Sequence, residues 1–431
     1  MSTHNTAASS TGSISGFPEE DLRTSGDDNP GYFPARLGQT LDGGRYCIVR
    51  KLGWGQYSSV WLAKDRGQGV FVALKILTCE ATSAMIPGEG QRTDEINLLE
   101  KISVAGPTHR GRRHTILYHH ALDFKGPRGK HCGIVTEALG YNLDYIRKLR
   151  DGGDLRVAPS IVKRVTKQVL LGLEYLHDAC GIVHGDLKHD NILFRPSDLD
   201  AVVAHELVSS PSVTYDCGTE VNPPVVPVVS QSLPLSPDPV INEKSLELVI
   251  ADVGHSHWQS HHFQEIIQPT ALRAPEVILG CPWGAPADIW NLGCLVTELL
   301  VGFWLFESNN EKAWGYDEDH LARMTEAVQS SFEPSFLDRC THRDKFFKAD
   351  GKSIPPIRRT VLNCGAGSFA HFTGHQEPTW PLRQLLDRFS ELPEAEILPA
   401  ERFLRRCLRL TPEERASAKD LIDDPWLAES V

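Results

Sequence analysis

The chain has no long hydrophobic run and no paired cysteine motif. Its longest apolar stretch, LGCLVTELLVGFWLF, is about 15 residues long and contains a glutamate, whereas a membrane-spanning helix needs about 20 residues. The ten cysteines are scattered without a CxxC pair, which favours reduced thiols. The start, MSTHNTAASSTGSISG, lacks the apolar core of a signal peptide. We therefore expect a protein of the cytoplasm and/or the nucleus, without a membrane partner.

Positive charge is also in short supply. The formal net charge is −12, which argues against non-specific binding to nucleic acid and favours a basic protein partner. A chain of 431 residues is too long for one small core and suits a two-lobed enzyme with tails and insertions. We expect a monomer that makes no direct contact with nucleic acid.

The most informative motif is HGDLKHDNIL at residues 184–193. Phosphoryl transfer from a nucleotide needs a group that orients the attacking hydroxyl and accepts its proton, which suits Asp186. It also needs a cation near the moving phosphoryl group, which suits Lys188. A neutral oxygen ligand for a metal completes the set, and Asn191 provides one. The motif therefore indicates nucleotide-dependent phosphoryl transfer.

A glycine-rich turn, KLGWGQYSSVWLAKD, lies upstream between two apolar runs. Gly53 and Gly55 allow backbone N–H groups to approach phosphate oxygens, because no Cβ blocks the approach. Ser58 stands where a third glycine is usual, so a plain β-hairpin turn is the competing interpretation. Lys75, in VALK, favours the phosphate-binding interpretation, because the spacing of two strands and a turn directs it back under the glycine loop.

Downstream, the apolar segment LVIADVGHSHW ends in a carboxylate, Asp252, followed by a glycine. Magnesium prefers oxygen ligands, so Asp252 is a second candidate metal ligand. ALRAPEVILG and ADIWNLGCLVTELLVG follow, and they contain Glu276 and Asp288. Near the end, LTPEERASAKDLIDDPWL supplies Arg415, a candidate partner for Glu276.

These motifs, in this order, resemble the eukaryotic protein kinase family from about residue 40 onwards. The resemblance implies an α+β, two-lobed kinase fold with a small β-rich N-lobe and a large helical C-lobe, and the use of ATP and Mg²⁺. By resemblance Asp186 is the catalytic base, Lys188 supports the transferred phosphoryl group, and Asn191 and Asp252 hold magnesium. The residues implied to bind or position ATP are Leu52, Gly53, Trp54, Gly55, Gln56, Tyr57, Ser58, Ser59, Val60, Lys75, Glu95, Glu137 and Leu139.

Glu95 is the implied partner of Lys75. Asp94 and Glu100 compete for this role, but Glu95 best precedes the apolar positions of TDEINLLEKI. Thr136 stands at the implied gatekeeper position before the hinge. Glu276 with Arg415, and Asp288, are implied to be structural clamps.

A narrower resemblance is to the SR-protein kinases, which act on arginine/serine-rich splicing factors. GYFPARLGQTLDGGRYCIVRKLGWG resembles that family's entry segment, ADVGHSHW its magnesium segment, and YDEDHLARMTEAV its acidic docking helix. The resemblance implies a serine/threonine kinase whose protein substrates are rich in Arg and Ser. The implied docking carboxylates are Asp317, Asp319 and Glu326.

Three departures and three rival functions remain open. Gly185 replaces a common Arg, Val253 replaces a Phe, and Thr270 is shifted by one residue relative to the family pattern. The rivals are a small-molecule kinase, because HGD followed by Asn also resembles aminoglycoside phosphotransferases, a degenerate kinase that only binds nucleotide or Arg/Ser-rich partners, and a scaffold. The histidines between 255 and 262 suggest zinc only weakly, because no Cys or carboxylate completes a tetrahedral set.

The expected domain organisation has four parts. Residues 1–38 are rich in Ser, Thr, Gly and Asp and are predicted to be disordered. Residues 39–139 form the N-lobe and hinge, and residues 140–428 form the C-lobe. Within it, the Pro-rich stretch at about 196–244 predicts a flexible insertion, because proline removes backbone donors from a sheet.

Overall fold

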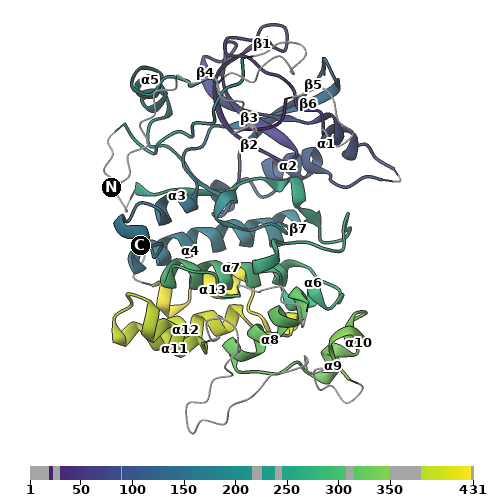
Figure 1. The fold of residues 1–431 in the computed structure, drawn as a ribbon, viewed down its shortest axis with the longest axis vertical. Helices are drawn as coiled ribbons and strands as arrows, with labels where there is room; N and C mark the ends of the chain where they lie inside the picture. Colours follow the sequence, from purple (N-terminus) through teal and green to yellow (C-terminus); the bar gives the residue numbers. More distant parts are fainter. Residues whose placement is uncertain are drawn as a thin grey trace, which may run out of the picture. The chain divides into compact units, whose positions relative to one another are not determined.

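The computed structural model describes residues 19–22, 30–88, 90–215, 226–237, 245–306, 315–348 and 380–428. The chain divides into two compact units (Figure 1). The first unit consists of residues 1–83, 120–135 and 203–232, and the second of residues 84–119, 136–202 and 233–431. Each unit is described by itself.

The first unit is built on a six-stranded sheet with the order β1-β2-β3-β4-β6-β5. Its strands are β1 (Thr40–Leu41), β2 (Tyr46–Gly55), β3 (Ser58–Asp65), β4 (Val70–Leu77), β5 (Tyr118–Gly126) and β6 (Gly129–Glu137). β2, β3 and β4 pair antiparallel, as expected from their alternating apolar residues. Tyr46, Ile48, Trp61, Leu74 and Val135 form the centre of the core of this unit.

An extended segment and two helices lie outside the sheet of the first unit. Residues 30–38 pack against the sheet, with Tyr32, Phe33 and Ala35 buried. Helix α1 (Cys79–Ala84) follows β4, and helix α5 (Leu199–Ser209) lies in the stretch that was expected to be a flexible insertion. The packed part of the chain therefore extends into the expected tail, because its aromatic side chains have apolar surface to bury.

Buried charged groups on β2 bind residues of the expected insertion and of the expected tail. Arg50 is 1% exposed and donates hydrogen bonds to the Ser210 carbonyl at 2.9 Å and the Gln231 carbonyl at 3.1 Å. Lys51 is also 1% exposed, and its Nζ donates to the carboxylates of Glu19, at 2.9 Å, and Glu20. The insertion is therefore packed against β2 at Glu206, Ser210 and Gln231.

The second unit is mainly helical. Its helices are α2 (Glu95–Val104), α3 (Leu143–Arg147), α4 (Pro159–Glu174), α6 (Pro275–Ile278), α7 (Ala285–Val301), α8 (Tyr316–Val328), α9 (Pro334–Leu337), α10 (Arg343–Phe346), α11 (Leu382–Phe389), α12 (Glu394–Cys407) and α13 (Ala418–Ile422). Two short ladders pair β7 (Ile182–Val183) with β10 (His257–Trp258) and β8 (Ile192–Phe194) with β9 (Leu248–Ile250).

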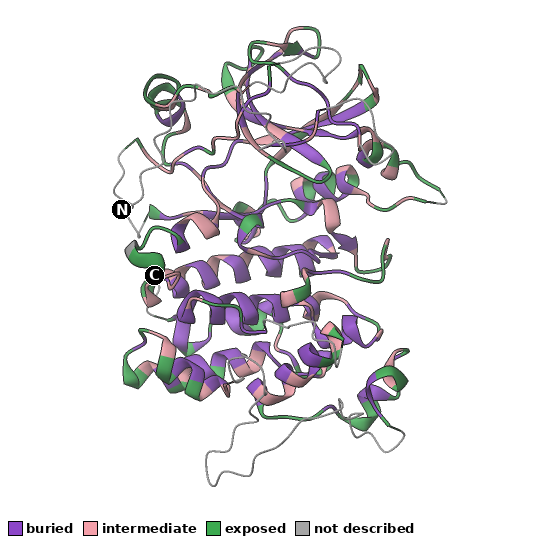
Figure 2. Cartoon of the chain, viewed as in Figure 1, coloured by how far each residue is buried: buried purple, intermediate pink, exposed green. Residues whose placement is uncertain are grey.

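Helix α7 forms the centre of the second unit. Its residues 287–301 are all buried, which Figure 2 shows as a continuous buried ribbon. Pro286 lies in its first turn, and Gly302, with φ of +88°, ends it in the left-handed conformation. Among the described residues, no helix is both long enough and apolar enough to cross a membrane.

Candidate active site

The loop between β7 and β8 brings three of the predicted site residues together. Lys188 Nζ donates to Asp186 Oδ2 at 2.7 Å, and Asn191 Nδ2 donates to the same oxygen at 2.9 Å. Asn191 Nδ2 also donates to the Asp186 carbonyl at 2.8 Å. Because Nδ2 points at Asp186, Oδ1 is the Asn191 atom that remains to coordinate a cation. The geometry holds one carboxylate between two donors, and the catalytic roles of the three residues remain predictions.

Helix α7 holds this loop through Asp288, which is fully buried. Its carboxylate accepts backbone N–H bonds from His184 at 2.8 Å and Gly185 at 2.9 Å, and it lies 2.8 Å from His177 Nε2. Burial opposes ionisation of Asp288, but its interactions with His177 and His184 and the bond from the Gly185 N–H keep its pKa below the usual value. The carboxylate is therefore a fixed anchor for the catalytic loop, in agreement with the clamp predicted from the sequence.

The backbone conformation of the loop at position 185 requires a glycine. Its φ is +72°, and a Cβ at this position would lie 3.1 Å from the His255 carbonyl oxygen. The Gly185 carbonyl accepts a hydrogen bond from the backbone N–H of Gln268 at 2.9 Å. An Arg at position 185, as in many kinases, does not fit this backbone without strain.

The structural role of Gln268 was not predicted from the sequence. This residue is buried and has a φ of +71°. Its Nε2 donates to Asn291 Oδ1 at 2.7 Å, and its Oε1 accepts from the Ala274 N–H at 2.8 Å. Thr270, in contrast, is exposed. Gln268 therefore joins the segment before α6 to both α7 and the catalytic loop, and only its position immediately before Pro269 hinted at a constrained backbone.

Asp252 begins the segment after β9 and is exposed, with a φ of +60°. The backbone places it near the catalytic loop, because the Ala251 N–H donates to the Asn191 carbonyl at 2.9 Å. His184 Nε2 lies 3.1 Å from the Ala251 carbonyl oxygen. A carboxylate and an amide oxygen on two hydrogen-bonded segments are ligand types that suit Mg²⁺. The residues thus fit the cation that the resemblance implies.

The contacts of Asp94 and Glu95 distinguish the two candidate partners of Lys75. Trp258 Nε1 donates to Asp94 Oδ2 at 2.9 Å, so Asp94 is used to connect α2 to the segment after Asp252. Glu95 is 4% exposed at the start of α2, and its Oε2 lies 3.2 Å from the Cβ position of Gly254. Lys75 belongs to the other unit, so its pairing with Glu95 remains a prediction.

The glycine loop forms the β2–β3 hairpin of the first unit. Gly53 pairs with Val60, and Val60 pairs with Lys75 on β4, so the lysine lies beside the hairpin as its spacing predicts. A Cβ at Gly53 or Gly55 would meet no atom within 4 Å, so the space beside them is open for a ligand. Residues Leu52 to Val60 thus fit the phosphate-binding loop that the resemblance implies.

The N-terminal segment ties down the tip of this hairpin. The Tyr32 hydroxyl donates to the Gly55 carbonyl at 2.7 Å, and its ring meets the Trp54 ring edge-on at 6.4 Å. Trp54 itself is 45% exposed. Tyr32 was assigned to the disordered tail, so the sequence analysis did not predict this contact.

The predicted hinge, Glu137 to Leu139, begins at the last residue of β6. Glu137 accepts hydrogen bonds from Arg195 Nε at 2.9 Å and from the Leu117 N–H at 3.0 Å. Thr136 Oγ1 donates to the Glu137 carbonyl at 3.2 Å, and the side chain of Leu139 is buried. The Glu137 side chain therefore stabilises the hinge, while the predicted contact of Glu137 and Leu139 with adenine stays a prediction.

The docking helix differs from the prediction at one position. Asp319 is 3% exposed, and Arg323 Nε donates to its Oδ2 at 2.7 Å. Asp319 therefore pairs within α8 instead of facing a substrate, because the two residues are one helical turn apart. Asp317 and Glu326 are partly exposed, and their docking role remains a prediction.

The histidines after Asp252 pack as aromatic groups. His257 is 2% exposed, and His262 stacks on Trp283 with ring centroids 3.7 Å apart. Burial, together with the neighbouring histidines, lowers the pKa of His257 to about 4. No group of three or more His, Cys, Asp or Glu side chains in the described parts of the chain is arranged to hold a metal ion.

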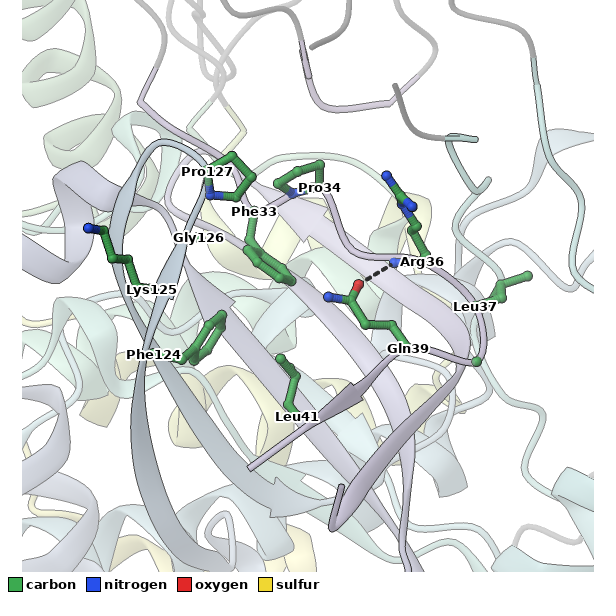
Figure 3. A pocket seen from close by; sticks show the side chains of 11 residues that line it. Phe33, Pro34, Arg36, Leu37, Gln39, Leu41, Phe124, Lys125, Gly126 and Pro127 are labelled. Carbon is green, nitrogen blue, oxygen red and sulfur yellow. Dashed lines mark hydrogen bonds between the residues drawn. The ribbon is translucent and has the colours of Figure 1, made fainter. Parts of the chain in front are cut away.

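A separate pocket of 720 Å³ lies in the first unit (Figure 3). It lies between residues 33–41 and the turn that joins β5 to β6. Phe33 and Phe124 meet edge-on at 5.0 Å in its floor, and Figure 3 shows both rings facing the hollow. The pocket contains none of the predicted site residues.

The comparisons with known proteins agree with this geometry. The family model described as a protein kinase domain matches residues 46–220 and 236–427. The chain belongs to the protein kinase family. The kinase is 32% identical to the serine/threonine-protein kinase SRPK of Physarum polycephalum, over 96% of this chain and 92% of that protein.

Two further relatives belong to the same group. Protein kinase dsk1 of Schizosaccharomyces pombe is 28% identical over 93% of this chain and 83% of that protein. SRSF protein kinase 3 of Mus musculus is 26% identical over 92% and 88%. The chain is therefore a serine/threonine protein kinase of the SRPK type.

A solved structure supports the fold. The crystal structure of a kinase domain matches with a TM-score of 0.64 and 21% identity, covering 92% of this chain and 98% of that one.

The predicted pair of Glu276 and Arg415 is present in this chain. Arg415 donates through Nη1 at 2.5 Å and through Nη2 at 2.6 Å to the two Glu276 oxygens, and both side chains are fully buried.

Proposed function

We propose that this kinase transfers the γ-phosphoryl group of ATP to serine or threonine in proteins rich in Arg and Ser. The observation that carries the reaction is the bonded set of Asp186, Lys188 and Asn191 in one loop. The substrate class rests on the SR-protein kinase motifs of the sequence and on relatives named SRPK and SRSF protein kinase.

In this proposal Asp186 orients the substrate hydroxyl and accepts its proton, and Lys188 offsets charge on the transferred group. Residues Leu52 to Val60 cover the phosphates, with Lys75 holding them and Glu95 positioning the lysine. Asn191 Oδ1 and Asp252 hold Mg²⁺, which neutralises phosphate charge. Asp317 and Glu326 pair with substrate arginines, whose planar guanidinium favours two-point binding to carboxylates.

We further propose that the kinase acts as a monomer in the cytoplasm and/or the nucleus, on a protein substrate, without a nucleic-acid or membrane partner. The cysteines among the described residues are all free thiols, in keeping with a reducing compartment. The net charge of −12 favours a basic protein as the partner.

The test uses the full chain with Mg²⁺, labelled ATP and an Arg/Ser-repeat peptide. Asp186→Ala is expected to lower kcat by roughly 10²–10⁴-fold, the usual loss on removal of a general base. A Lys/Ser peptide of equal length tests the substrate class. Near-normal turnover by Asp186→Ala contradicts the catalytic assignment, and equal use of both peptides contradicts the substrate class alone.

A further inference from the structure

Two exposed aromatic residues follow α7. Phe303 is 39% exposed and Trp304 is 36% exposed. Gly302 ends the helix before them, and its N–H donates to the Glu298 carbonyl at 2.7 Å. Phe306, after them, is fully buried and stacks on Trp290 with ring centroids 5.6 Å apart. The chain is thus fixed on both sides of the pair, so the aromatic rings are held at the surface of the second unit.

Trp304 lies directly against the catalytic loop. Its ring meets the ring of His189 edge-on, with centroids 5.9 Å apart. His189 is 3% exposed and directly follows Lys188. On its other sides His189 Nε2 lies 3.4 Å from Glu298 Oε2, and Nδ1 lies 3.5 Å from Arg147 Nη1. The loop residue that Trp304 contacts is therefore immobilised, and the exposed indole has a defined place beside the reacting groups.

An aromatic cluster that includes Phe303, but not Trp304, already binds the guanidinium group of Arg388. Phe303 packs on Phe389 at 5.3 Å, and Phe389 packs on Trp380 at 5.8 Å. The guanidinium carbon of Arg388 lies 4.8 Å from the centre of the Trp380 ring and 5.6 Å from that of Phe389. Cations are attracted to aromatic faces at these distances, and arginine is the side chain most often found there. The aromatic cluster therefore suits a planar cation.

An exposed carboxylate follows the residue that Trp304 contacts. Asp190, which follows His189, is exposed and accepts a hydrogen bond from Asn142 Nδ2 at 3.3 Å. Asp144 is partly exposed and pairs with Arg147 and Lys148. Glu298 is buried behind His189. Asp190 is thus the exposed carboxylate next in the chain to the residue that Trp304 contacts, whereas Asp144 and Glu298 are paired with Arg147. A guanidinium group also loses less hydration on stacking than an ammonium group does.

We propose that Trp304 forms a subsite for an arginine side chain of the substrate peptide, with the guanidinium stacked on the exposed indole face beside the catalytic loop. This proposal rests on the proposed function and adds a specificity-determining residue to it. Phe303 has the same exposure but packs on Phe389 instead of the catalytic loop, so it provides a matched control.

The experiment measures kcat and KM of the full-length kinase with three peptides of equal length: Arg/Ser, Lys/Ser and citrulline/Ser repeats. Citrulline keeps the shape of arginine but carries no charge. The variants are Trp304→Ala, Trp304→Phe, Trp304→Leu and Phe303→Ala. Trp304→Ala and Trp304→Leu are expected to raise KM for the Arg/Ser peptide by about 3- to 30-fold, the range that one cation–π contact supplies.

The kcat for the Arg/Ser peptide and both constants for the citrulline/Ser peptide are expected to stay within about twofold in these variants, because only a binding contact is removed. Trp304→Phe is expected to retain part of the preference for arginine, and Phe303→Ala all of it. A Trp304→Ala enzyme that loses activity equally on the Arg/Ser and citrulline/Ser peptides overturns the subsite, because Trp304 then only supports the loop.

Retention of the full arginine preference by Trp304→Ala overturns the subsite as well. These outcomes are distinguishable from failure of the proposed function, which is read from the wild-type enzyme. A wild-type kinase that uses Arg/Ser and citrulline/Ser peptides equally overturns both proposals, whereas a discriminating wild type together with an unaffected variant overturns the subsite alone.

Discussion

At the scale of single residues, Gly185 is the position in the catalytic loop with the least tolerance for a side chain. Its positive φ costs an L-residue about 1–2 kcal/mol, and the His255 carbonyl oxygen lies 3.1 Å from the Cβ position. We expect Gly185→Ala to lower both the free energy of unfolding and kcat. Urea unfolding and steady-state kinetics provide the measurements.

Gly181→Ala is the matched control, because Gly181 has a φ of +70° and open space around its Cβ position. It should show the backbone strain alone, with kcat unchanged. If the two alanine variants are equally stable and equally active, the contact with His255 has no role.

His257 makes stability depend on pH. Its pKa in the folded state is lowered to about 4 by burial and by neighbouring histidines, below the unfolded value of about 6.5. The unfolded state therefore binds more protons between these values, so stability is fully present above pH 6.5 and is lost as the pH falls towards 4. We expect the free energy of unfolding of His257→Phe to fall less steeply over this window, as measured by urea titration at a series of pH values.

His261→Phe is the control for that experiment, because His261 is exposed. It should leave the slope of the free energy of unfolding against pH unchanged. His189 and His320, whose pKa values burial lowers to about 3, maintain part of the slope in every variant. A His257→Phe slope equal to that of the wild type rules out His257 as a source of the pH dependence.

At the scale of elements, the attachment of the N-terminal segment to β2 depends on one buried ammonium group. Lys51 is bonded to Glu19 and Glu20, which are 8% and 2% exposed. Lys51→Met leaves the two buried carboxylates without their cation. Removing one partner of a buried ion pair lowers the free energy of unfolding by about 3–5 kcal/mol. We expect a loss of that order in urea unfolding.

The triple variant Lys51→Met, Glu19→Gln, Glu20→Gln removes the charges together and should recover most of the lost stability, because neutral groups of similar shape are cheaper to bury. If Lys51→Met alone is as stable as the wild type, the N-terminal segment is not held by this ion cluster.

At the scale of the whole molecule, net charge should determine how salt affects catalysis. With a charge of −12, the kinase attracts a basic peptide over distances that fall from about 30 Å at 0.01 M salt to about 8 Å at 0.15 M. We expect kcat/KM for an Arg/Ser peptide to fall over this range, and kcat/KM for a citrulline/Ser peptide to change little. Initial-rate kinetics at constant Mg²⁺ provide the measurement. Parallel curves of kcat/KM against salt concentration for the two peptides contradict the prediction.

Features that depend on residues close together in the sequence were easier to predict than features that depend on residues far apart in it. Lys75 was placed correctly beside the glycine loop, because two strands and a turn leave few alternatives. The Asp319 error was avoidable, since Arg323 stands four residues later on the same predicted helix, a spacing that forms ion pairs. Gln268 was not predictable, because its bonds to Gly185 and Asn291 join segments far apart in the sequence.

The amino-acid sequence by itself determined the family and the order of its motifs, because phosphoryl transfer requires particular groups at short, fixed spacings, and the roles of Asp186, Lys188 and Asn191 stay predictions. Only the tertiary structure decided that residues 30–38 and α5 are packed, that Asp319 is buried, and that Trp304 is exposed beside the catalytic loop. These outcomes depend on burial and on ion pairs between distant residues such as Lys51 and Glu19, whose energies exist only once the chain is folded.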